Sequence, residues 1–123
     1  MNRWIVFAIG LLLLSFGLWK GRLNKAFEAL EIYNYFEAKR QFERSMNQYP
    51  SAASYGLSVI YGRDDNPFHQ LDSALKYALK AIEYFPEDDD KSLEFIATHG
   101  VTDSTLQAQL QYVDSFAFER SKE

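Results

Sequence analysis

Two histidines, His69 and His99, are the residues of this chain best suited to bind a metal ion or to transfer a proton. His69 follows the turn-forming run Asn66-Pro67-Phe68, and His99 comes directly before Gly100. A metal site would also need a carboxylate and a convergent geometry, and nothing in the spacing predicts these. We therefore expect no metal site, and we interpret His99 as a cation that favours a helix C-terminus.

Two acidic runs, Asp64-Asp65-Asn66 and Asp88-Asp89-Asp90, offer oxygen ligands of the kind that calcium prefers. Neither run has the alternating ligands, central glycine and terminal glutamate of an EF-hand loop. Aspartate and asparagine are also the residues that begin turns and cap helices. We therefore interpret the first run as a turn and the second as the start of a helix.

Other catalytic signatures are missing from the sequence. The chain has no cysteine, so a thiolate nucleophile, a disulfide and a cysteine metal cluster are excluded. It has no nucleophile-elbow motif, no glycine-rich phosphate loop and no HExxH motif. The net charge of −4 and the pI of about 5.2 argue against nucleic acid as a partner. We expect a protein that is not an enzyme and that carries no cofactor.

Apolar residues recur at helical spacing in three stretches that follow Gly21. These stripes are Leu23, Ala26, Phe27 and Leu30; then Ala38, Phe42, Ser45 and Met46; then Ala74, Leu75, Ala78, Ala81 and Ile82. Turn signals separate them at residues 33–35, 49–51, 62–67 and 85–86. No stretch alternates with a period of two, so we predict an all-α fold of antiparallel helix hairpins without a sheet.

Two prolines, Pro50 and Pro86, lie 36 residues apart and end helices in the same way. A period in this range is typical of stacked supersecondary units. The spacing of small residues, an aromatic residue and a proline resembles the tetratricopeptide repeat, and the residues that carry it are Tyr33, Ala38, Phe42, Ser45 and Pro50. The second unit resembles it through Ala74, Ala81 and Pro86, although Ala78 replaces the aromatic residue. It is also similar to the longer Sel-one-like variant, through Leu57, Tyr61, Ala74, Tyr77, Ala81 and the long loop 62–71.

The resemblance implies a short solenoid with three parts after an N-terminal segment, residues 1–19. The parts are a first hairpin over residues 20–50, a second over residues 51–86, and a divergent third hairpin or cap over residues 87–123. In the last part, Gly100 ends one helix and Thr102 or Asp103 caps the next. So few repeats also make self-association an expectation, because arrays usually need about three or more.

Residues 4–19 form an uncharged apolar segment between Arg3 and Lys20, with Trp4 and Trp19 at its ends. As a helix it spans about 24 Å, near the short limit for a hydrocarbon core of about 30 Å. Tryptophan prefers the two membrane interfaces, so we predict a single-pass membrane anchor. A cleaved signal peptide is the alternative, although no A-x-A cleavage site occurs. The side of the membrane that holds the domain stays open.

Charge is divided unevenly along the chain. Residues 20–63 hold seven basic and four acidic side chains, whereas residues 64–123 hold five basic and thirteen acidic ones. The basic half adjoins the apolar segment, which suits an anionic headgroup surface. Solvation of two helix faces explains the same distribution equally well.

Repeats of this class bind extended peptides or partner helices in a concave groove. The resemblance therefore implies a protein or peptide partner, and helix-face arguments select its candidate contacts, Asn24, Lys25, Tyr55, Ser58 and Arg63. We expect a membrane-anchored scaffold or adaptor that mediates protein–protein interaction near the bilayer. Two alternatives remain: the anchor and spacer of a larger envelope protein whose activity lies beyond residue 123, and a secreted soluble repeat protein.

Overall fold

A computed structural model describes the backbone of residues 3–121 and the side chains of residues 17–120. Every regular element in this part of the chain is a helix, which confirms the prediction of an all-α fold. The elements are α1 (Arg3–Glu31), α2 (Tyr35–Ser45), α3 (Pro50–Gly62), α4 (Leu71–Tyr84), the 3₁₀ helix η1 (Phe85–Glu87), α5 (Asp90–Ala97) and α6 (Asp103–Ser121).

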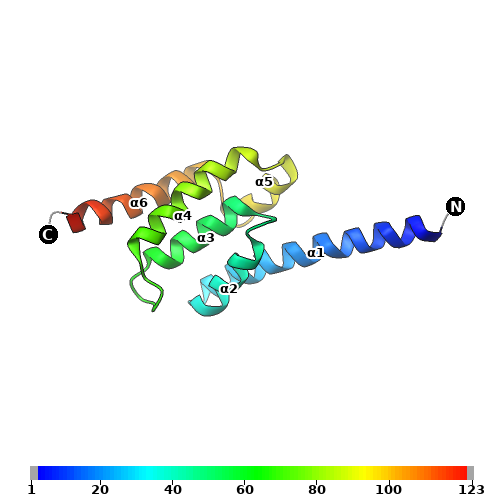
Figure 1. Ribbon diagram of the computed structural model, residues 1–123, viewed down its shortest axis with the longest axis horizontal. Coiled ribbons are helices and arrows are strands. Elements are labelled where there is room, and N and C mark those ends of the chain that lie inside the picture. The colour runs from blue at the N-terminus through cyan, green and yellow to red at the C-terminus, as the bar shows by residue number, and fades with distance from the viewer. Residues whose placement is uncertain (1–2, 122–123) are drawn as a thin grey trace.

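Helix α1 is 29 residues long, and its N-terminal part extends away from the other helices (Figure 1). The predicted anchor, residues 4–19, lies mostly outside the residues whose side chains the structure describes. Within the described residues, no helix combines the length and the apolar character needed to cross a membrane. The membrane anchor therefore stays a prediction.

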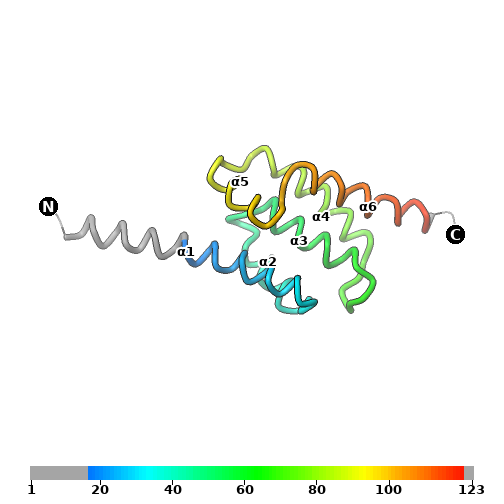
Figure 2. Tube along the Cα trace, turned by 180° about the vertical axis from the view of Figure 1, so that it is seen from behind, coloured from blue at the N-terminus to red at the C-terminus, as the bar shows by residue number. Residues whose placement is uncertain are grey.

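The remaining helices stack in the order in which they follow one another along the chain. The C-terminal half of α1 packs against α2, α2 packs against α3, and α3 pairs with α4. Helix α6 then lies beside α4 and also reaches α3, while the short α5 and its turns join α4 to α6 (Figure 2). The result is two hairpins and a following helix, with α3 at the centre of the stack.

Local sequence signals explain where the helices begin and end. The Asn34 side chain accepts a hydrogen bond from the Glu37 backbone N–H at the start of α2. Asp89 accepts one from the Ser92 N–H and thereby caps α5, as its position in the acidic run predicted. Pro50 was expected to end a helix but is instead the first residue of α3, where its missing N–H has no cost. Pro86 lies in η1, directly after the end of α4. Gly100 follows α5 with φ of +79°, a left-handed conformation that glycine adopts without strain.

The core between the first and second hairpins is built around Phe42. Its ring is fully buried and meets the Phe27 ring edge-on, with 5.0 Å between centroids. The ring also fills the space that a side chain on Gly56 would take. Small side chains bring α3 equally close to α4, where the buried Ser58 hydroxyl donates to the Ala74 carbonyl at 2.8 Å. The apolar stripes of the sequence are thus the faces that pack.

Candidate functional site: a concave groove

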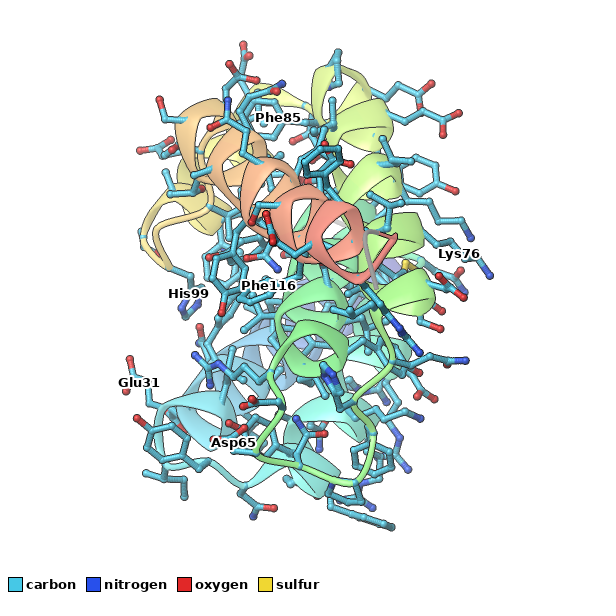
Figure 3. All side chains as sticks on the ribbon, turned by 90° about the vertical axis from the view of Figure 1, so that its left-hand side faces the viewer. Glu31, Asp65, Lys76, Phe85, His99 and Phe116 are labelled. Carbon is cyan, nitrogen blue, oxygen red and sulfur yellow. The ribbon has the colours of Figure 1, made fainter. Side chains whose placement is uncertain are left out.

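One groove of about 300 Å³ lies on the side of the stack formed by α1, α3 and the turn between α5 and α6. Its lining is mixed, because the apolar side chains of Phe27, Leu30 and Val59 stand beside the polar or charged side chains of Glu31, Tyr55, Arg63, Thr98 and His99. Figure 3 shows Glu31 and His99 on this side of the molecule, whereas Lys76 of α4 lies on the opposite side. Three segments distant in sequence therefore build one surface.

His99 connects the α5–α6 turn to α1 across this groove. Its imidazole stacks on Phe27 at 4.5 Å and meets Phe95 edge-on at 5.6 Å. Its Nε2 lies 2.7 Å from Oδ1 of Asn24, to which the Nε2-protonated tautomer donates. Burial lowers the pKa of His99, and the partly opposing effect of Glu31 and Glu28 is smaller. Burial against Phe27 therefore disfavours the charged form of His99, which works against the cationic role expected for it at a helix C-terminus.

Arg63 stands at the end of α3, at the edge of the groove. Its guanidinium lies 5.7 Å from the Tyr33 ring centroid and 5.9 Å from that of Tyr35. Its Nη1 donates weakly, at 3.4 Å, to the Tyr35 hydroxyl. Among the described residues, no carboxylate lies within ion-pair distance of it. Arg63 thus forms no direct ion pair in this part of the chain, although Glu31 lines the same groove and Asp65 accepts from the Tyr35 hydroxyl that Arg63 contacts.

The Tyr35 hydroxyl holds the loop after α3 in place next to this arginine. It donates to both carboxylate oxygens of Asp65, at 2.7 and 2.9 Å. Burial, followed by the hydrogen bond to Asp65, raises the pKa of Tyr35. The phenol therefore stays protonated and positions the loop at neutral pH.

The five predicted contact residues separate into three groups. Tyr55 and Arg63 line the groove, and Asn24 joins it through its hydrogen bond to His99. Lys25 is exposed on α1 but is not part of the groove lining. Ser58 is fully buried and also accepts a hydrogen bond from Gln109, so it packs helices together instead of facing a partner. The helix-face argument failed there because α3 is covered by α4 and α6 as well as by the first hairpin.

Phe27, Leu30 and His99 line the groove but were not among the predicted contacts. The first two belong to the apolar stripe of α1, which indicated burial and gave no sign that part of the stripe borders a groove. His99 stands next to a helix end in the sequence, but its contacts across the groove, Asn24 and Phe27, lie more than seventy residues away along the chain. Comparison of the chain with family models, curated proteins and solved structures finds no match.

The groove offers noncovalent binding groups, namely apolar side chains, the Glu31 carboxylate, the Arg63 guanidinium and the His99 imidazole. His69 does not join His99, because it lies in a different cleft beside α6. No group of three potential metal ligands occurs among the described residues. Tyr55 adds a half-buried phenol, and burial raises its pKa so that it remains a hydrogen-bond donor. Such a surface suits an extended or helical segment of another protein.

The stability of the domain should fall as the pH decreases below the ordinary pKa of histidine, about 6.5. Since the pKa of His99 is lowered on folding, the unfolded chain binds more protons in this range, and protons favour unfolding. The stability that the uncharged His99 contributes is therefore present in full at pH 7. It is lost as the pH falls through the pKa of His99 in the folded protein. Urea unfolding of His99→Phe, which keeps a stacked ring but cannot titrate, should lack this component. An unchanged pH profile in His99→Phe would refute the assignment.

Proposed function

We propose that this chain is a membrane-anchored helical-repeat protein that binds a segment of a partner protein in the concave groove. The observation that carries the proposal is the groove itself, in which Tyr55, Arg63 and His99 stand beside a small apolar surface. Arg63 is free of carboxylate partners among the described residues, so it can interact with a polar group of an incoming chain. No residue of the groove requires a cofactor for this role.

The packing order supports a repeat of the tetratricopeptide type. In such arrays each helix contacts its hairpin partner and the next hairpin, and the contacts from α1 to α4 follow this order. The residues of the sequence pattern also occupy the matching packing positions, because Ala38, Phe42 and Ser45 are buried on α2. Tyr61 and Tyr77 stack between α3 and α4 at 5.7 Å. These contacts support the proposal without assigning a family.

Residues 4–19 would hold the groove close to a bilayer. Helix α1 runs without interruption from Arg3 to Glu31, so it joins this apolar segment directly to the groove. Asn24 follows residue 19 by five positions, or about 8 Å along a helix. Intact-mass measurement of the native protein tests the anchor: a mass that begins at Met1 supports it. A mass that begins near Leu18 would show cleavage and remove the membrane part of the proposal.

Partner binding is tested by comparing variants of the full chain in pull-downs from a nonionic detergent extract. We expect Tyr55→Ala and Arg63→Glu each to reduce the captured partner at least about tenfold, as for central contacts of an interface. Lys76→Glu changes charge equally on the opposite side and should leave capture unchanged. Circular dichroism confirms that each variant is folded. Equal capture by all three variants would exclude the groove as the binding site.

A further inference from the structure

A second surface lies along the C-terminal half of α6, outside the concave groove. One face of α6 packs against the other helices: Leu106 and Val113 are buried, and Gln109 donates a hydrogen bond to Ser58. Tyr112 and Phe116 lie one turn apart and pack edge-to-face at 4.8 Å, yet they stay 50% and 43% exposed. Both rings line the same open hollow. Helix α6 thus presents an aromatic surface of the kind that helices usually bury.

This surface borders a cleft between α6 and the segment that runs from Arg63 into the start of α4. The cleft consists of three adjoining hollows of about 390, 470 and 340 Å³. Leu71 lines all three, Phe116 lines the first two, and Arg120 lines the last two, so the hollows form one continuous channel. Figure 3 shows Phe116 of α6 and Asp65 of the loop at this end of the molecule. Between Tyr112 and Arg120, α6 rises about 12 Å, the length of two helical turns.

The rim of the cleft is acidic. Its lining and edge carry four carboxylates against two guanidinium groups; the carboxylates are Asp64, Asp65, Asp72 and Glu119. One of the two guanidinium groups, that of Arg63, already lies against two tyrosine rings. The chain around the cleft is also negatively charged overall, because residues 64–123 contain thirteen acidic and five basic side chains. An occupant with basic edges would therefore be attracted, and one with acidic edges would be repelled.

We propose that this cleft binds a basic amphipathic helix of a partner protein. The apolar face of that helix packs on Tyr112, Phe116 and Leu71, in the way the next helix of a stack would pack on α6. Lysine or arginine residues at its edges face Asp64 and Asp72. This binding is independent of the concave groove, although Arg63 borders both, so either proposal can fail alone.

The test uses a fluorescent helical peptide of about 14 residues, long enough for nearly four turns. Its leucines recur at positions i, i+3, i+4 and i+7, and lysines flank them; a matched peptide has glutamate in place of lysine. Fluorescence anisotropy is measured with the full chain in nonionic micelles, with empty micelles as the blank. We expect the basic peptide to bind at least about tenfold more tightly than the acidic peptide. Raising the salt from about 0.05 to 0.3 M should weaken its binding.

Variants separate the contribution of the aromatic pair from that of the rim. Tyr112→Gln with Phe116→Gln should reduce affinity at least about tenfold, whereas Phe36→Gln, on the exposed side of α2, should not. Asp64→Lys with Asp72→Lys should reverse the preference between the two peptides, and Glu83→Lys, an exposed change elsewhere on α4, should preserve it. Tyr55→Ala, which tests the concave groove, should leave peptide binding unchanged.

Three outcomes would overturn the proposal. Equal binding of both peptides would show that the cleft is an apolar surface that does not select by charge. Peptide binding no stronger than that to empty micelles would show that the cleft is not a binding site. Self-association of the chain that Phe116→Gln abolishes would assign the cleft to a second copy instead of a partner helix. Analytical ultracentrifugation of the wild-type chain and of Phe116→Gln at the concentrations of the binding assay distinguishes this last case.

Discussion

Phe42→Ala is expected to reduce the free energy of unfolding by about 3–5 kcal/mol, the usual cost of removing a buried phenylalanine ring. Phe42 is fully buried, touches Phe27 edge-on and fills the space over Gly56, so its loss opens a cavity between the two hairpins. Domains of this size are stable by only about 5–15 kcal/mol. The change would therefore remove a large share of the total stability, and it is measured from urea unfolding followed by circular dichroism.

Phe36→Ala is the matched control, because it removes the same side chain from the same helix. Phe36 is 75% exposed on α2, although its ring is 5.9 Å from that of Phe68. A surface substitution of this kind changes stability by about 0.5 kcal/mol or less. If both variants lost similar stability, the first hairpin would not be packed through Phe42, and the position of the groove residue Phe27 would lose its support.

Gly56→Ala is expected to destabilise the domain by about 1–3 kcal/mol, the range found for overpacked cores. A Cβ at this position of α3 would overlap three atoms of the Phe42 ring, which is itself enclosed on its other sides. Within a helix the same substitution would otherwise gain about 0.5–1 kcal/mol, since alanine loses less backbone entropy. Tertiary packing therefore reverses the sign that helix propensity alone predicts.

Gly21→Ala shows the propensity effect alone. No heavy atom lies within 4 Å of a Cβ built on Gly21, which is also inside a helix. This variant should gain about 0.5–1 kcal/mol.

Phe42→Leu should relieve part of the loss in Gly56→Ala, so the double variant should be less destabilised than the two single losses combined. Strict additivity would show that the two residues do not collide.

Much of the secondary structure follows from residues that are close together in the sequence. Asn34, Asp89 and Gly100 act within one helical turn of their positions, and the loop after α3 falls where its residue types indicated. The expected turn at residues 49–51 is only partly correct, because Pro50 and Ser51 belong to α3. The apolar stripes also identified the packed faces, because a helix must bury its apolar side somewhere. Ala38 and Phe42 on α2, and Ala74 on α4, are buried as that reasoning requires.

The candidate site was harder to predict from the sequence. Two of its three walls, α1 and the α5–α6 turn, are joined by the contacts of His99 with Asn24 and Phe27, seventy or more residues away. The charge of His99 depends on that burial and could not be inferred from a position next to a helix terminus. Tyr55 and Arg63 were identified from helix faces, whereas Ser58 on the same helix was misplaced.

The sequence by itself determined that the chain is helical, where most helices begin and end, and which stripes of each helix are apolar. Those properties depend on local backbone preferences and on the period of side chains along one helix. Only the tertiary structure decided which apolar stripes meet and which residues stay open in the groove and the cleft. The tertiary structure buried Ser58, disfavoured the charged form of His99, and left Tyr112 and Phe116 exposed. The burial and the charge state of a side chain depend on the residues that surround it, and here those residues are distant in the chain.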